Sequence, residues 1–179
     1  MNLLYTIGHG TLSSDDFTLT LRKADIAIAA DVRRFAGSRR HPQFGAMAMD
    51  GWLQTARIGY RTFPDLGGRR DPAPESRNVG LRNAGFRGYA DHMDAPEWRD
   101  AFARLLALAR EAPTAIFCAE TLWWNCHRRL IADAAVLLAG FEVVHLARAS
   151  RATHVVTPGV RVAGDGLIYE SAKAGTSPA

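Results

Sequence analysis

The stretch TAIFCAETLWWNCHRRLIADAAVLLAG, residues 114–140, decides the fold because it joins a short apolar run to a longer amphipathic one. The apolar run at 114–119 predicts a buried strand. From His127 to Ala139, apolar residues recur with helical spacing, and Gly140 is the residue type that commonly ends a helix. The stretch therefore predicts a strand, a loop and a helix in succession.

The same alternation of strand and helix extends to both sides of this stretch. Further strands are predicted at 3–8, 27–32, 141–146 and at the start of 60–68. Further helices are predicted after a cap at Ser13 or Ser14, and at 47–58, 86–93 and 96–110. Strands that alternate with helices favour a mostly parallel sheet.

These elements predict a single α/β domain over residues 1–171. We expect a five-stranded, mainly parallel sheet with helices on both faces, a Rossmann-like architecture. Residues 64–85 are rich in Gly, Pro and Arg and predict a long surface loop. VRVAGDGLIYE at 160–170 predicts a small C-terminal hairpin that turns at Gly164–Asp165–Gly166. Residues 172–179 are expected to form a disordered tail.

Composition and charge narrow the classes of partner. The chain has 179 residues, a formal net charge of +4 and a pI of about 9.5, which favours anionic partners. Its cations are almost all arginines, whose planar groups suit phosphate and carboxylate. No apolar run approaches the roughly 20 residues of a membrane helix, and MNLLYTIGHG lacks the pattern of a secretory signal. We therefore expect a cytoplasmic protein that binds an anionic small molecule or a nucleic acid, and no membrane.

Reactive side chains follow several of the predicted strands. His9, Asp31 and Glu120 each stand at or just after the end of a strand. Parallel strands end at the same edge of a sheet, where α/β proteins place their sites. We therefore expect a cleft at this edge, in which Asp31 or Glu120 transfers protons. The candidate catalytic residues are Asp31, Glu120, Cys126, His127 and His9.

Arginines, glycines and aromatic residues near the same strand ends suggest the ligand. Basic residues interleaved with aromatic ones suit stacking on bases and contact with phosphates. Two adjacent glycines let backbone amides approach a phosphate, and one of the two adjacent tryptophans is expected to stack on a ring. The candidate anion-binding residues are Arg33, Arg34, Arg39, Gly67, Gly68 and Arg128, and the candidate stacking residues are Trp123, Trp124 and Phe44.

The cysteines admit more than one interpretation. Together with His127 and His9, Cys118 and Cys126 offer four zinc ligands. A spacing of eight residues is unlike a zinc knuckle, however, and an adjacent Cys–His pair rarely aims both side chains at one ion. We therefore favour no metal, and the sequence identifies no cofactor. Alternatively, Cys126 is a thiolate nucleophile beside His127 and Arg128 at a helix N-terminus, with Cys118 as a core residue.

A strand, a cysteine, a loop and a helix, with DVR at 31–33 on an earlier strand, are similar to rhodanese-like and cysteine-phosphatase enzymes. The loop between cysteine and arginine is shorter in those enzymes. Counted from Cys118, it would place the arginine where this chain has Trp124, and Arg128 lies further on. Thiol-based sulfur transfer or phosphatase action therefore remains an alternative function. So do a non-catalytic nucleic-acid-binding module and a metal-binding protein.

Several motifs also occur in a fixed order along the chain. They are TIGHG at 6–10, DVRRFAGSRRHPQF at 31–44, LGGRR at 66–70, FRGYADHM at 86–93, CAETLWWNCHRRLIADA at 118–134 and HLARASRATHVVTPGVRVAGDGLIYE at 145–170. Together they resemble the domain of unknown function 488 family over nearly the whole chain. The resemblance implies an α/β fold and a soluble prokaryotic protein, and some members carry the label of DNA repair protein. We expect an enzyme that binds a nucleotide or a nucleic-acid phosphate in the cleft.

Overall fold

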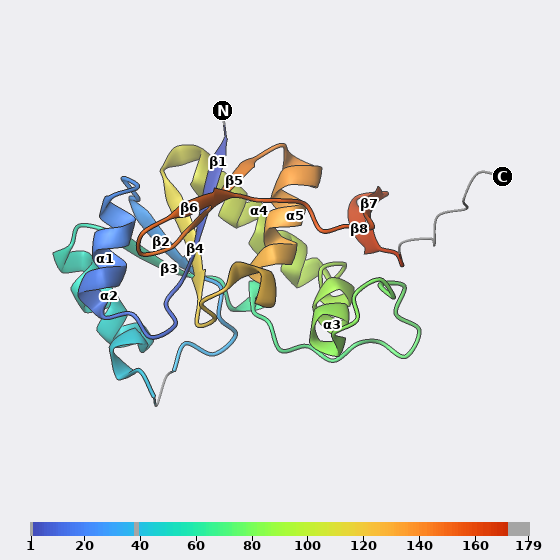
Figure 1. Cartoon of the computed structure of the whole chain (residues 1–179), viewed down its shortest axis with the longest axis horizontal. Helices are drawn as coiled ribbons and strands as arrows, with labels where there is room; N and C mark the ends of the chain where they lie inside the picture. The colour runs from blue at the N-terminus through green and yellow to red at the C-terminus, as the bar shows by residue number, and fades with distance from the viewer. Residues whose placement is uncertain (1, 38–39, 172–179) are drawn as a thin grey trace.

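The structure is a computed structural model that describes residues 2–37 and 40–171. In this part of the chain a six-stranded sheet has the order β3-β2-β4-β1-β5-β6 (Figure 1). Five neighbouring strands are parallel, and β6 pairs antiparallel with β5. The strands are β1 (Leu3–Gly8), β2 (Ile28–Asp31), β3 (Gly59–Thr62), β4 (Thr114–Cys118), β5 (Glu142–Leu146) and β6 (Arg151–Thr153).

The predicted α/β class is confirmed, with its mainly parallel sheet and its separate C-terminal hairpin of β7 (Val160–Ala163) and β8 (Gly166–Tyr169). The sheet has one strand more than expected. All three residues of β6 are exposed. An exposed edge strand needs no apolar run, so the pattern of hydrophobic residues gives no sign of it.

Helices cover both faces of the sheet, as Figure 1 shows. On one face, α1 and α2 share a buried cluster that includes Phe17 and Phe117. On the other, Leu105 of α4 and Ile131 of α5 join Ile116. Ile116 and Phe117 are neighbours on β4, and the pleat sends them to opposite faces. The helices are α1 (Ser14–Arg22), α2 (Ala46–Thr55), α3 (Ala84–His92), α4 (Pro96–Glu111) and α5 (Arg128–Ala139), with short 3-10 turns at Pro42–Phe44, Pro64–Leu66 and Trp123–Asn125.

The strand order creates a crevice at the carboxyl edge of the sheet. β4 lies between β1 and β2, unlike the 3-2-1-4-5-6 order of dinucleotide-binding folds. The chain leaves β1 through α1 toward β2, and it leaves the adjacent β4 through α5 toward β5 in the opposite direction. The helices α1 and α5 therefore lie on opposite faces of the sheet, and ligand sites of doubly wound sheets lie between neighbouring strands whose connections leave to opposite faces.

Local signals set the ends of the helices. Ser13 caps α1 by accepting a hydrogen bond from the backbone N–H of Asp16 at 3.0 Å, as the sequence predicts. Gly140 ends α5, as predicted. The second helix ends at Thr55 rather than at residue 58, because Arg57 adopts a positive φ of 61° and turns the chain toward β3.

The predicted long loop at 64–85 is anchored to the C-terminal hairpin. The Gly80 N–H donates to the carbonyl of Tyr169, and the Tyr169 N–H donates to Asn78 Oδ1. From α3, the carboxylate of Asp91 accepts hydrogen bonds from Asn78 Nδ2 and from the hydroxyl of Ser76. The loop therefore has fixed attachments on both α3 and β8.

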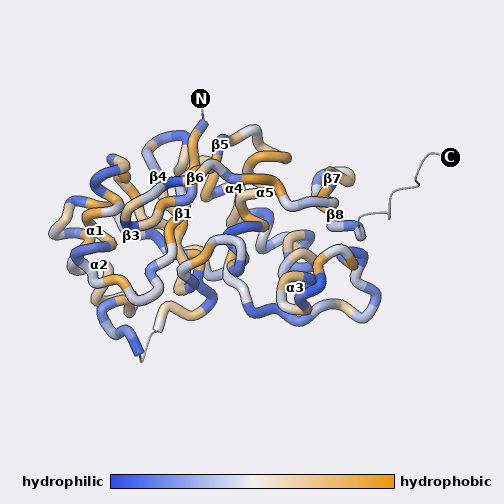
Figure 2. Tube along the Cα trace, in the orientation of Figure 1, coloured by the Kyte–Doolittle hydropathy of each residue, from blue (hydrophilic) through white to orange (hydrophobic). Residues whose placement is uncertain are grey.

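Hydropathy follows this layering. Figure 2 shows hydrophobic stretches along β1 and α5, whereas the chain that leads to α3 is mainly hydrophilic. Over the described ranges, no helix is both long and apolar enough to cross a membrane. The predicted tail at 172–179 lies outside the described residues.

A buried hydrogen-bond chain ties the sheet to α5. His154 Nε2 lies 2.9 Å from Asp133 Oδ1, and a carboxylate only accepts, so His154 donates there. In the neutral ring of His154, Nδ1 then accepts from His145 Nε2 at 3.0 Å, and His145 Nδ1 accepts from the hydroxyl of Thr6 at 2.7 Å. The second oxygen of Asp133 accepts from the Tyr169 hydroxyl of β8 at 3.0 Å. The chain thus joins β1, β5, α5 and the hairpin through donors that all point toward Asp133.

Asp133→Asn should lower the free energy of unfolding by about 1–3 kcal/mol. The amide has one acceptor oxygen in place of two, and the hydrogen bonds from His154 and Tyr169 lose their ionised partner. Urea unfolding followed by circular dichroism measures the change. Asp50→Asn, at an exposed position of α2, is the matched control. Equal stability of the two variants would contradict a structural role for the chain.

The same chain should make stability depend on pH. Burial lowers the pKa of His145 from 6.5 to about 3, with the charges of His154 and Arg128 as smaller causes. Between these values the unfolded state binds the proton and the folded state does not, so the free energy of unfolding falls as pH decreases from about 6.5 toward 3. One such proton gives a slope of up to about 1.4 kcal/mol per pH unit. Urea unfolding between pH 7 and pH 5 should show a smaller slope for His145→Gln, and equal slopes would refute this explanation.

Candidate functional site

A pocket of about 500 Å³ opens at the carboxyl edge of the sheet. Its walls come from the chain after β1, β2, β3 and β4, from the first turns of α3 and from the residues just before α5. The pocket therefore lies where the strand order predicts a crevice. Of the sequence-predicted site residues, His9, Arg33, Arg34, Gly68, Glu120, Cys126 and His127 line it.

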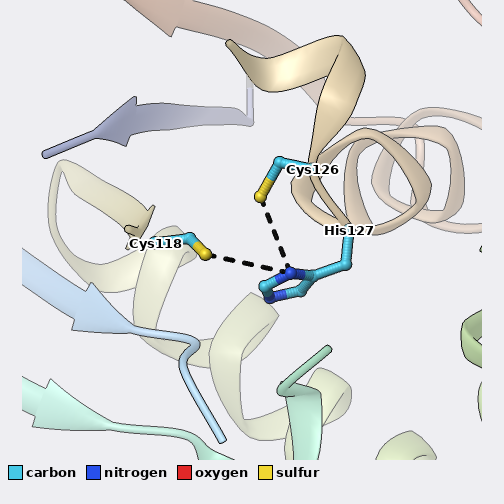
Figure 3. A group of neighbouring side chains, drawn as sticks. All are labelled: Cys118, Cys126 and His127. Carbon is cyan, nitrogen blue, oxygen red and sulfur yellow. Dashed lines mark hydrogen bonds between the residues drawn. The ribbon is translucent and has the colours of Figure 1, made fainter. Parts of the chain in front are cut away.

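Two sulfurs and an imidazole form the floor of the pocket (Figure 3). His127 Nδ1 lies 3.6 Å from Cys126 Sγ and 3.9 Å from Cys118 Sγ. Cys126 has extended backbone angles (φ −129°, ψ 150°), whereas His127 is helical (φ −57°, ψ −19°). This change of conformation turns two adjacent side chains toward one point, an arrangement that we expected to be rare. Cys118 reaches the same point from the end of β4, so it is not only a core residue.

The hydrogen bonds of His127 fix which nitrogen carries its proton. Nε2 lies 2.8 Å from the carbonyl oxygen of Val32 and must donate to it. In the neutral ring, Nδ1 is then an acceptor that faces the two sulfurs. The Tyr89 ring packs beside the imidazole at 5.1 Å between centroids. The floor is thus oriented by a strand end on one side and by α3 on the other.

Charge is distributed unequally between the two thiols. Burial alone would raise the pKa of Cys126, but the hydrogen bond from Cys118 and the positive surroundings of His127 and Arg128 outweigh it, so this pKa lies well below its ordinary value. The hydrogen bond to Cys126, followed by burial, raises the pKa of Cys118 well above the ordinary value. Arg128 Nε donates to Cys126 Sγ at 3.3 Å, which accounts for the direction. Negative charge on the pair is therefore held by Cys126.

Arg128 supports the floor from behind. Its side chain is 0% exposed, and Nη2 donates to the carbonyl oxygen of Glu120 at 2.6 Å. We expected Arg128 to hold phosphate, but the structure does not bring it into the pocket lining. It instead holds the loop between β4 and α5 and the sulfur of Cys126.

His9 presents an unpaired nitrogen beside this floor. The residue is 2% exposed, its ring stacks on Phe44 at 4.1 Å, and Nδ1 lies 3.1 Å from the carbonyl of Gly10. Nδ1 must donate to that carbonyl, which leaves Nε2 as an acceptor. Nε2 has no hydrogen-bond partner among the residues that the structure describes. Burial, partly offset by the Gly10 hydrogen bond, lowers the pKa of His9 to about 4, so the ring is neutral at neutral pH.

Asp31 and Arg33 form a buried ion pair in the neighbouring wall. Arg33 Nε and Nη2 donate to the two carboxylate oxygens of Asp31 at 2.8 and 2.6 Å, and Nη1 donates to the carbonyl of Phe44. The Tyr60 hydroxyl also donates to Asp31, and burial, with the charge of Asp31, raises the pKa of that phenol. Asp31 does not line the pocket, and Arg33 lines it with a guanidinium that is already paired. This unit holds the wall in place.

Cations gather at the rim of the pocket. Arg34, Arg40 and Arg69 line it, and Arg34 Nη1 donates to the backbone carbonyl of Arg69. Burial and then the charge of Arg34 lower the pKa of Arg70. Glu120 is the acidic residue among the described lining residues. Arg39, another candidate, lies outside the described residues.

The predicted stacking residues are placed elsewhere. Phe44 is buried in the core, and Trp123 stacks on His145 at 4.0 Å between centroids. Trp124 is half-exposed and meets Trp123 edge-on, and neither tryptophan lines the pocket. Gly67 is packed tightly against Arg34 and is also absent from the lining.

Several lining residues were not among the candidates, although Phe35 belongs to the segment of interleaved arginines and aromatic residues in which the sequence predicts stacking. The aromatic rings at the pocket are Phe35, Phe86 and Tyr89. Phe35 lies within the arginine-rich loop, and its exposure of 64% marks it as a free surface ring. The α3 residues carried no signal, because their spacing is that of an ordinary amphipathic helix. Arg69, which directly follows the two predicted glycines, was also not among the candidates.

Comparisons with known proteins agree with the sequence motifs. The family model described as Domain of unknown function DUF488 matches residues 13–135. This range includes the motifs at 31–44, 66–70, 86–93 and 118–134, but not those at 6–10 and 145–170, so the match is shorter than the resemblance suggested. The searches of curated proteins and of solved structures found no match. Because the family model covers more than half of the chain, from α1 to the middle of α5, the protein belongs to the DUF488 family.

Proposed function

We propose that the protein is an enzyme that binds an anionic substrate with a ring, a nucleotide or a nucleic-acid end, in the pocket at the carboxyl edge. The observation that carries this proposal is the composition of the pocket. Arginines gather at its rim, and buried reactive side chains form its floor. A non-catalytic binding module would need the arginines of the rim, but not the reactive side chains of Cys118, Cys126 and His127 at the floor.

The rim supports the anionic part of the proposal. Arg34, Arg40 and Arg69 come from two separate loops and surround one opening. Guanidinium groups bind phosphate with two parallel hydrogen bonds, and several of them around one concavity raise the local concentration of anions. The lone carboxylate of Glu120 does not cancel three cations.

The aromatic residues support a ligand with a ring. The ring of Phe35 is largely exposed beside the guanidinium of Arg34, 5.4 Å from its centroid. Phe86, in the first turn of α3, also lines the pocket, and the guanidinium of Arg129 lies 4.8 Å from its ring centroid. Aromatic side chains next to arginines stack on bases without preference for sequence. A nucleobase stacked on one of these rings would leave its phosphate near the arginines of the rim.

In this proposal, Glu120 and His9 transfer protons. Glu120 is an exposed carboxylate of the pocket, and the Nε2 of His9 is a buried acceptor of the same pocket. A carboxylate and a neutral imidazole serve as general bases. Asp31, the other acid–base candidate, has both oxygens occupied by Arg33 and Tyr60 and acts as a positioning residue in this proposal. A role in DNA repair would be one use of such chemistry and is part of the proposal, as are a cytoplasmic location and a prokaryotic source.

Replacing Arg34 and Arg69 together with alanine should weaken binding of a short fluorescein-labelled single-stranded oligonucleotide. Each lost charged hydrogen bond is worth about 1.5–3 kcal/mol, or roughly tenfold to a hundredfold in the dissociation constant. Fluorescence anisotropy at several salt concentrations measures affinity, and the salt dependence should become shallower in the variant. Arg104→Ala with Arg57→Ala, two exposed arginines outside the lining, removes the same charge as a control. Equal weakening in both double variants would show only an effect of net charge.

Glu120→Gln should lower turnover about 10²–10⁴-fold while the dissociation constant stays near that of the wild type. The glutamine keeps the size of the side chain and removes its basicity. End-labelled oligonucleotide and a nucleoside triphosphate are suitable probes, with products separated by chromatography. Glu142→Gln, at the start of β5, is the control. Binding by the wild type with no product from either probe would instead favour the non-catalytic module.

A further inference from the structure

We propose that Cys118, Cys126 and His127 bind one zinc ion at the floor of the pocket, with the fourth coordination position open to the substrate. The spacing of these residues in the sequence led us to expect no metal. The structure brings their donor atoms together nevertheless, all within 4.8 Å of one another.

The distances between the donors fit a tetrahedral ion. Zinc lies about 2.3 Å from sulfur and about 2.0–2.1 Å from an imidazole nitrogen, so two such ligands at a tetrahedral angle stand about 3.6 Å apart. His127 Nδ1 lies 3.6 Å from Cys126 Sγ and 3.9 Å from Cys118 Sγ. An ion fits between these atoms with shifts of a few tenths of an ångström. Thiolates and imidazoles bind zinc in preference to magnesium or calcium, which favour oxygen ligands.

The surrounding hydrogen bonds are those of a metal site. Ligand histidines usually donate their other ring N–H to a carbonyl or a carboxylate, which orients the ring. The Nε2 of His127 donates to the carbonyl of Val32 at 2.8 Å and leaves Nδ1 for the ion. Arg128 Nε donates to Cys126 Sγ, as N–H groups do to metal-bound thiolates. Two thiolates and a divalent cation carry no net charge, which suits a buried location.

The remaining coordination position faces the pocket. All three donors line it, and the described residues offer no fourth His, Cys, Asp or Glu ligand within the cluster. Structural zinc sites have four protein ligands, whereas catalytic ones have three and keep a place for water or substrate. The unpaired Nε2 of His9 belongs to the same pocket and would accept a hydrogen bond from a zinc-bound water.

Gly68 leaves room for the imidazole that would bind the ion. A Cβ atom on this residue would lie 2.8 Å from His127 Nδ1, the ligating nitrogen. Any side chain there would press on the ring that binds the ion. A glycine in LGGRR therefore serves the floor of the pocket directly, in addition to any contact of its amide with an anion.

The ion would polarise an oxygen of the substrate or activate a water beside it. This use of the ion rests on the proposed function, because it assumes an anionic substrate in the pocket. The site itself rests only on the three side chains and their partners. Metal content and oligonucleotide binding are therefore measured separately. A protein without zinc would contradict only the metal site, and a protein that does not bind the oligonucleotide would contradict only the proposed function.

The test is the zinc content of the full chain, purified without a histidine tag after expression with added zinc. Mass spectrometry with an inductively coupled plasma should find one zinc per chain. Titration against a chromophoric chelator should show that Cys126→Ser and His127→Gln each weaken zinc binding by more than the roughly 10–100-fold that is typical for loss of an outer partner. His92→Gln, which alters a histidine of α3 outside the pocket lining, should keep the zinc and is the matched control.

Cobalt(II) provides a second readout that does not depend on the folding of any variant. Added to the metal-free wild type, it should give the intense visible bands of a tetrahedral ion and a thiolate-to-cobalt charge-transfer band. Wild-type protein that takes up neither zinc nor cobalt would overturn the proposal. So would a Cys118–Cys126 disulfide in the freshly purified protein, because it would show that the sulfurs serve as a redox pair.

Discussion

A buried positive charge sets the course of the chain around the site. Arg128 lies at the start of α5 with its side chain wholly inside the protein, so each of its N–H groups needs a partner there. The loop after β4 supplies them by curling back, so that the carbonyls of Glu120 and Thr121 meet the guanidinium. Gly8 at the end of β1 leaves room for that turn, since a Cβ atom there would lie 1.9 Å from the Glu120 carbonyl oxygen. The same guanidinium donates a hydrogen bond to Cys126 Sγ, so Arg128 holds both the loop after β4 and one sulfur of the floor.

The fold could be read from the sequence to a large extent, because buried parallel strands and amphipathic helices leave strong periodic signals. The five parallel strands, the cap at Ser13 and the terminal hairpin all followed from such patterns. β6 did not, since an exposed edge strand has no apolar period. The pocket also lies at the edge where the sequence predicts a cleft, because parallel strands end at the same edge of the sheet. The number and order of strands at that edge depend on tertiary packing, and this information is not local in the sequence.

Side-chain roles within the site were harder to predict. Whether Arg128 faces a ligand or the interior depends on which carbonyls lie opposite, and Phe44 enters the core because a 3-10 turn redirects it. The cysteines show the same limit. Spacing rules for metal ligands assume a regular backbone between them, whereas the backbone here changes from extended to helical between Cys126 and His127. The pocket consequently combines a floor fixed by buried polar contacts with a rim of longer, exposed arginines.

The hydrogen-bond chain from Thr6 through His145 and His154 to Asp133 has a consequence for how this sequence can vary. Its donors all point one way, so each ring has a single proton position that its neighbours dictate. If one member is replaced by a side chain that donates where the original accepts, or accepts where it donates, its neighbour in the chain loses its hydrogen bond, because a donor then faces a donor or an acceptor faces an acceptor. These residues span positions 6 to 154, yet a substitution at one of them constrains which residues can stand at the others. Homologues that alter one of them should carry compensating changes at the others, which makes covariation among the four positions a signature of this packing.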